Sequence, residues 1–229
     1  MKTIITLILV FFLVGEKSTN KIYTEGEYIF SLKIFNNGKE VKLKFNEPHY
    51  LSIDSLGNEN NFEDAWEFGS EKNIEFLGLE MMDGIINDGQ KTIKWNYYDS
   101  NFNKINESIT GLIENDSVIW LHPPRVKYFK ILEINPFPEV RFHEMTWSSD
   151  LNVGDQWGNE RWNTWKGNLK IHSKYKYEKQ TGIIKSEADT EIGTTKLISE
   201  FNPTKGFTKF DYTNIDGSRV LLELIELRK

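Results

Sequence analysis

Apolar and polar residues alternate one by one along much of this chain, and a period of two restricts the folds that it can form. Residues 28–35 place Tyr28, Phe30 and Leu32 at every second position, and residues 168–177 repeat the pattern. Successive side chains of a β-strand point to opposite faces of a sheet, whereas an amphipathic helix repeats its apolar face over a longer period. The pattern therefore predicts strands, several of them with one buried face and one face in water.

Turn-forming residues separate the alternating stretches. Asn36, Asn37 and Gly38 follow the first stretch, and Asp216 and Gly217 precede the last; Asn and Gly accept a positive φ at little cost. Short strands bounded by such turns indicate hairpins and meanders. Further strands are predicted at residues 41–45, 73–82, 91–98, 105–113, 117–121, 127–134, 183–191, 196–201, 207–213 and 219–227.

The composition supports the same fold class. Ala65 and Ala188 are the only alanines, whereas aromatic residues make up 14% of the chain. Alanine is the strongest helix former, and aromatic side chains favour strands. We therefore expect an all-β protein with little helix, an antiparallel barrel or sandwich built from hairpins and meanders.

The N-terminus has the pattern of a secretory signal peptide. Met1 and Lys2 precede an uncharged, largely apolar run over residues 3–15, which is shorter than the roughly 20 apolar residues that span a bilayer. Gly15 suits a cleavage site but Leu13 does not, so an uncleaved anchor or a buried first strand remain alternatives. We expect a signal peptide at residues 1–15 and a single β domain at residues 16–229. A subdivision near residue 140 is the alternative.

These features predict an exported protein, either periplasmic or extracellular (at the cell surface or beyond it), with no transmembrane span in its mature form. Its formal net charge of −6 argues against nucleic acid as a partner, because contacts to phosphate dominate that affinity. The chain has no cysteine, which excludes disulfides, thiol catalysis and cysteine-ligated metals.

The middle of the chain breaks the period of two. Four of its prolines lie in residues 122–138, and we expect residues 123–140 to form the crossing between two sheets of one continuous β architecture. Residues 141–165 follow as a polar, non-alternating loop whose carboxylates and amides are interleaved with indoles. Exposed indoles beside such groups suit a sugar-binding face, with core packing as the alternative. The predicted ligand-binding residues are Trp147, Trp157, Trp162 and Trp165, with His122 and Arg125 at the edge.

No motif identifies catalytic residues. The chain contains no Gly-x-Ser-x-Gly elbow and no Ser-x-x-Lys, and none of its histidines has a recognised metal spacing. His122, Glu139, His143 and Glu144 form a metal or acid–base set only if the fold brings them together. His172 is expected on the face of a strand. We therefore predict no metal and no cofactor, and the catalytic residues stay unknown.

Three short runs resemble a set of uncharacterised exported proteins of Gram-negative bacteria. They are residues 120–125 (WLHPPR), residues 132–138 (LEINPFP) and the pair Trp157-Gly158. Residues 201–217 are similar to the closing hairpins of the β-barrel-like domains in that set. The resemblance covers residues 110–229 and implies a β fold in the cell envelope. It implies no activity and transfers no catalytic residue.

Together these observations predict an envelope-associated binding module without catalysis. Its ligand would be a glycan or an amphipathic small molecule held in a barrel mouth. One alternative is a glycan-acting hydrolase that uses two carboxylates. The other alternative is a structural partner of an envelope protein complex.

Overall fold

The structure is a computed structural model that describes residues 21–44, 73–87, 89–125, 127–153 and 169–228. The predicted signal peptide lies outside this range. Within the range the chain forms antiparallel strands and one 3₁₀ helix. In chain order these elements are β1 (Glu27–Asn36), β2 (Lys39–Val41), β3 (Leu43–Lys44), β4 (Asn73–Ile74), β5 (Phe76–Asn87), β6 (Gln90–Tyr98), β7 (Lys104–Glu114), β8 (Val118–Leu121), η2 (Lys127–Ile134), β9 (Glu139–Arg141), β10 (Thr146–Val153), β11 (Leu169–Glu178), β12 (Ile183–Thr190), β13 (Gly193–Asn202), β14 (Gly206–Thr213) and β15 (Arg219–Arg228).

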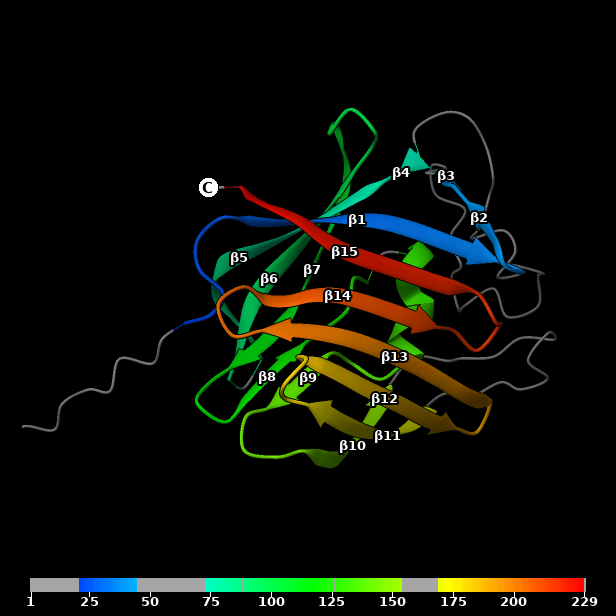
Figure 1. Ribbon diagram of the computed structural model, residues 1–229. Helices are drawn as coiled ribbons and strands as arrows, with labels where there is room; N and C mark the ends of the chain where they lie inside the picture. Colours follow the sequence, from blue (N-terminus) through cyan, green and yellow to red (C-terminus); the bar gives the residue numbers. More distant parts are fainter. Residues whose placement is uncertain (1–20, 45–72, 88, 126, 154–168, 229) are drawn as a thin grey trace, which may run out of the picture.

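One 13-stranded sheet contains nearly all of these strands. Its order is β10-β11-β12-β13-β14-β15-β1-β5-β6-β7-β8-β9, with β2 paired to β1, and β3 and β4 form a separate pair. The large sheet curves strongly, so that β5–β8 lie behind β11–β15 (Figure 1). The all-β class with hairpins and meanders is therefore confirmed, in the form of one curved sheet whose end strands are β9 and β10.

The first hairpin shows how the turn residues act. Asn37 and Gly38 both have positive φ, at 50° and 74°, between paired residues Asn36 and Lys39. Two consecutive residues of positive φ match the right-handed twist of the flanking strands. The Asn-Gly sequence therefore ends β1 and sends the chain back as β2.

Strict alternation is clearest in the meander, which we define as β11–β15. In β11 the buried residues are Leu169, Ile171, Ser173, Tyr175 and Tyr177, and the residues between them are exposed. The outward positions of neighbouring strands carry opposite charges, such as Lys174 beside Asp189. One face of the meander therefore enters the core and the other meets water.

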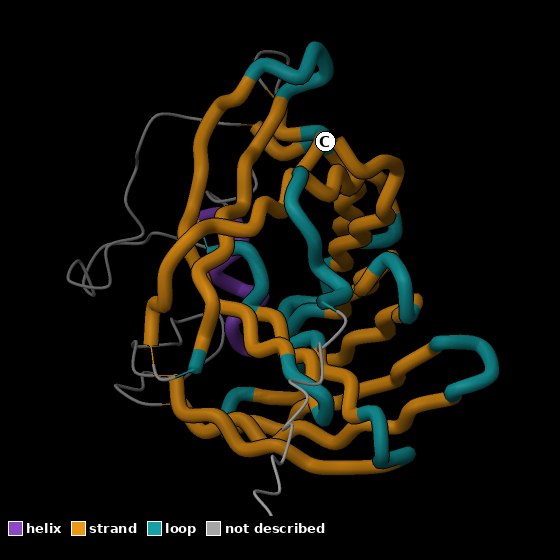
Figure 2. The backbone as a smooth tube through the Cα atoms, turned by 90° about the vertical axis from the view of Figure 1, so that its left-hand side faces the viewer, coloured by secondary structure: helices purple, strands orange, loops and turns teal. Residues whose placement is uncertain are grey.

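The core contains a segment that lies inside the curve of the sheet. Figure 2 shows η2 (purple) enclosed by strands. We call residues 127–138 the inner strap. The predicted strand at Lys127–Ile134 is wrong, because these residues form 3₁₀ helix η2. The expected crossing between two sheets is also wrong, because the strap joins β8 and β9, which pair within one sheet.

The inner strap is buried from several sides, which explains the wrong assignment. Phe129, Ile131, Leu132 and Ile134 are all fully buried. An apolar run with no solvent-facing side has no periodicity that separates strand from helix. The ring of Phe129 stacks on Tyr97 of β6 at 5.5 Å between centroids, so the strap packs directly on the inner face of the sheet.

Side chains of the sheet satisfy the polar groups of the strap. The Thr195 hydroxyl donates to the Ile134 carbonyl at 2.9 Å, and the Tyr175 phenol donates to the Phe137 carbonyl at 3.1 Å. The side-chain amide of Asn135 donates to the side-chain oxygen Oδ1 of Asn214, in the turn after β14, at 2.8 Å. A buried polar group without a partner costs about 1–3 kcal/mol, so these bonds make burial of the strap possible.

Candidate functional site

The two ends of the sheet meet through side chains, and Trp147 lies at this junction. Its side chain is 7% exposed and stacks on Tyr175 at 5.0 Å. The Arg141 guanidinium lies 5.9 Å from the Trp147 ring and binds Glu139 at 2.6 Å. We call Glu139, Arg141, Trp147 and Tyr175 the seam. Trp147 thus packs in the core, which is the alternative that the sequence left open. The loop expected at residues 141–165 is wrong at Thr146–Val153, because these residues form strand β10.

Burial gives the seam an unusual carboxyl group. Glu139 is 4% exposed, and burial raises its pKa despite the hydrogen bond from Arg141. Glu144 also binds Arg141, at 3.1 Å, whereas His143 is exposed. The set of His122, Glu139, His143 and Glu144 therefore does not assemble as a metal site. Among the described residues, no group of three or more His, Cys, Asp or Glu side chains is placed to hold a metal ion.

His122 and Arg125 follow β8 and approach the inner strap. The His122 ring packs on Phe137 at 4.9 Å, and Arg125 pairs with the buried Glu133 at 2.8 Å. The other predicted indoles, Trp157, Trp162 and Trp165, lie outside the described residues. Whether His122, Arg125 and the four tryptophans bind a ligand therefore stays a prediction.

A row of polar side chains crosses the outer face at one rim of the sheet. Asp150 of β10 pairs in register with His172 of β11, which pairs with Asp189 of β12. The His172 Nδ1 and Asp150 Oδ1 atoms are 2.6 Å apart, and Thr194 donates to Asp189 at 3.2 Å. We call Asp150, His172 and Asp189 the polar row. Antiparallel pairing fixes the spacing of these side chains across the strands.

The polar row borders a hollow of about 650 Å³ at the ends of β10, β11 and β12. This volume is within the range of small-ligand sites. Besides the polar row, Lys170 lines the hollow, whereas Leu151 and Ile171 border it from the core side, where Ile171 is buried. The outward-facing lining thus contains carboxylates, an imidazole and an ammonium group. This arrangement provides hydrogen-bond donors and acceptors.

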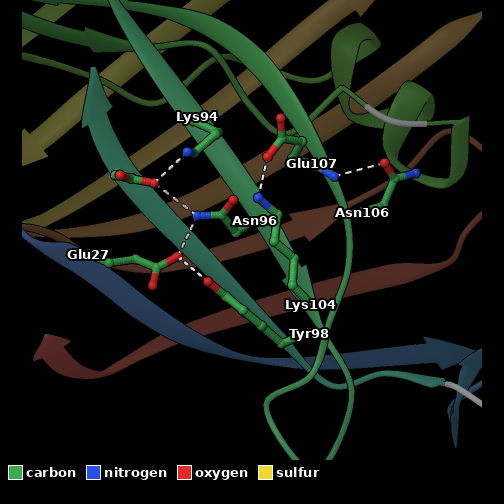
Figure 3. A network of polar contacts seen from close by, with 8 residues as sticks. Glu27, Lys94, Asn96, Tyr98, Lys104, Asn106 and Glu107 are labelled. Carbon is green, nitrogen blue, oxygen red and sulfur yellow. Dashed lines mark hydrogen bonds and ion pairs between the residues drawn. The ribbon is translucent and has the colours of Figure 1, made fainter. Parts of the chain in front are cut away.

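A second polar network lies on the outer face of β1, β5 and β6 (Figure 3). The Tyr98 phenol and the Asn96 amide both donate to Glu27, at 2.7 and 2.6 Å. Lys94 binds Glu80 at 2.8 Å and lowers the pKa of that carboxyl group. Each carboxylate of this network already has partners within it. The network therefore links neighbouring strands through side-chain hydrogen bonds and ion pairs.

Glu139 lies apart from the hollow. A glycoside hydrolase needs a general acid whose pKa is raised, facing the same cleft as a second carboxylate. Burial raises the pKa of Glu139, but Glu139 lies in the seam and binds Arg141 rather than lining the hollow.

Sequence analysis missed the polar row because its members come from three different strands. His172 was expected on a strand face, and its outward position agrees with that prediction. Its neighbours Asp150 and Asp189 cannot be chosen among 34 acidic residues without the strand register. The available signal was that each residue occupies an outward-facing position in the alternation of its own strand. This signal identifies a row only when the pairing of the three strands is known.

Comparison with known proteins gives little information on function. No protein-family model and no curated protein matches the chain. A crystal structure from Bacteroides fragilis, of a protein described as a candidate exported protein with a YmcC-like fold, covers 90% of this chain and 97% of its own. Its sequence identity is 12% and the TM-score is 0.37. In the part of the chain that the structure describes, no helix has the length and apolarity to cross a membrane.

Proposed function

We propose that this chain is an exported binding module that holds a glycan at the hollow beside the polar row, without cleaving it. The observation that carries this proposal is the fixed row of Asp150, His172 and Asp189, which lines the hollow together with Lys170. A sugar presents hydroxyl groups around its edge and apolar C–H groups on its ring faces. The polar row and Lys170 offer hydrogen-bonding partners to the hydroxyl groups.

The position of the hollow in the chain supports a glycan. Residues 154–168 connect β10 to β11, and this connection contains Trp157, Trp162 and Trp165. The residues that flank this connection, Val153 and Leu169, form the last pair between β10 and β11. The neighbouring pair, Asn152 and Lys170, lines the hollow. Under the proposal these indoles cover the apolar face of the sugar while the polar row binds its hydroxyl groups.

The interior of the sheet offers less for an amphipathic molecule. The inner strap occupies it, and Phe129, Leu132 and Ile134 are fully buried against the strands. A ligand in the interior would have to displace these contacts and the hydrogen bonds to Thr195 and Tyr175. A surface glycan needs no such rearrangement. The signal-like residues 1–15 support a position outside the cytoplasm, where envelope glycans are found.

The test is a titration of the protein with a panel of short neutral, acidic and amino-sugar oligosaccharides, followed by NMR of the backbone amides. We expect at least one oligosaccharide to shift amides of β10, β11 and β12. Replacing His172 by Ala removes a hydrogen-bonding group of the row and should weaken that binding about 10-fold or more. The matched control is Lys185→Ala, which removes an outward residue of β12 that pairs with Glu178.

Two results would contradict the proposal. One is a panel in which no oligosaccharide shifts the amides of β10–β12. The other is a His172→Ala variant that binds the oligosaccharide as tightly as Lys185→Ala does. Cleavage of the bound oligosaccharide during the titration would instead support the hydrolase alternative.

A further inference from the structure

Three aromatic side chains hold the C-terminal end of the inner strap against β8. The ring centroids of His122 and Phe137 are 4.9 Å apart, those of Trp120 and Phe137 are 5.4 Å apart, and those of Trp120 and His122 are 6.0 Å apart. Phe137 is 5% exposed. We call Trp120, His122 and Phe137 the aromatic clasp. The imidazole thus replaces a third hydrocarbon ring in an otherwise apolar contact.

The surroundings of His122 on balance favour its neutral form. Burial beside Phe137 disfavours the charged ring, and this effect outweighs the hydrogen bond that Nδ1 donates to the Pro123 carbonyl at 2.7 Å, which favours the charged ring. The charged group that acts on His122 is Arg125, which lies in the same connection and pairs with Glu133 of the strap at 2.8 Å. A second positive charge at His122 would be repelled by Arg125 and would be buried against aromatic carbon.

The clasp is joined to the strap by one backbone hydrogen bond that can report on its state. The Leu121 amide, next to His122, donates to the carbonyl of Pro138 at the end of the strap. The distance is 2.9 Å. Separation of Phe137 from Trp120 and His122 would carry Pro138 away from β8. Solvent exchange of the Leu121 amide therefore follows opening of the clasp.

We infer that the aromatic clasp is an acid-operated latch. When His122 takes up a proton, the clasp opens and residues 135–138 leave β8, while the meander stays folded. Opening exposes part of the interior that the strap fills at neutral pH. The latch is independent of the hollow at β10–β12, so its failure would leave the proposed glycan site unaffected.

The direction of the pH dependence follows from the burial of the imidazole. Burial lowers the pKa of His122 from 6.5 to about 4. Above pH 6.5 the imidazole is neutral in both the closed and the open state, so closure is fully favoured. As the pH falls from 6.5 towards about 4, the open state binds a proton first and closure is lost.

The test is native-state hydrogen exchange by NMR, expressed as protection factors so that the intrinsic pH effect cancels. Between about pH 7.5 and about pH 5, we expect the opening constant reported by the Leu121 amide to rise about 30-fold. The Leu197 amide, in the centre of the meander, serves as the internal reference. The variants His122→Phe and His122→Gln both lack the titrating group and should lose the pH effect at Leu121.

Three outcomes would overturn the latch. In the first outcome, protection of the Leu121 amide in the wild-type protein does not change with pH. In the second outcome, protection at Leu121 falls on acidification in both His122 variants by as much as it does in the wild-type protein. In the third outcome, protection falls equally at Leu121 and Leu197, because acid then unfolds the whole sheet rather than the clasp. Two variants of different shape keep the test valid if one of them fails to fold.

Discussion

The meander and the inner strap are both buried in the same core, but they are held there in different ways. In the meander, alternate side chains face the core, and backbone amide and carbonyl groups pair in the ladders between strands. The inner strap lies outside any ladder. Its carbonyl groups at Ile134 and Phe137 depend on single side chains, Thr195 and Tyr175, that reach in from the sheet.

This difference predicts where the molecule tolerates change. A ladder spreads the loss of one side chain over many bonds, and outward residues of the meander contact mainly water and charged neighbours. The strap has contacts on several sides, and its polar groups have few alternative partners. Substitutions in and under the strap should therefore cost more free energy of unfolding than equivalent substitutions on the outer face of the meander.

The largest effect is expected from removing a core contact of the strap. Phe129→Ala deletes a fully buried ring that stacks on Tyr97, and it should lower the free energy of unfolding by about 3–5 kcal/mol. Chemical denaturation measures this value. Ile198→Ala on the outer face of β13, where Ile198 is 41% exposed, should change it by less than about 1 kcal/mol. Equal losses in the two variants would remove the distinction between strap and meander.

An intermediate effect is expected at the hydrogen bond between sheet and strap. Thr195→Val keeps the volume of the side chain but leaves the buried Ile134 carbonyl without its donor, at a cost of about 1–3 kcal/mol. Thr213→Val, at an exposed position of β14, is the matched control and should be close to neutral. If both variants denature at the same urea concentration as the wild-type protein, the strap does not depend on this bond.

The smallest effect is expected from an ion pair on the outer face of the meander. Lys196 binds Glu187 at 3.0 Å, and both side chains are at least half exposed. Lys196→Gln should lower the free energy of unfolding, measured by chemical denaturation, by less than about 1 kcal/mol. Added salt should reduce the difference from the wild-type protein further, because ions screen exposed charges. A larger loss that persists in high salt would show that the outer face contributes to the fold as strongly as the strap.

Much of the fold was predictable because alternation is a local property of the backbone. Strands predicted at residues 28–35, 91–98 and 219–227 correspond to β1, β6 and β15 within a few residues. The strap was not predictable in this way. Its residues are buried on several sides, so the assignment of Lys127–Ile134 as a strand had no periodic signal to correct it.

The candidate site shows the same limit. The sequence singled out tryptophans by their type, but Trp147 lies in the seam, and the other three members of that segment lie outside the described residues. The polar row was missed, although the alternation of each strand places its residue on the outer face of the sheet. Residue type and parity select candidates, whereas proximity across strands requires the register of the sheet.

By itself the sequence determined that the protein is all-β, which faces of the meander are wet and where its hairpins turn, since these depend on neighbouring residues. The tertiary structure decided that residues 127–138 lie within the curved sheet, that its ends meet at Trp147, and that Asp150, His172 and Asp189 form one row. These features depend on contacts between distant segments, and such contacts are chosen by the free energy of the whole packed core rather than by any local pattern.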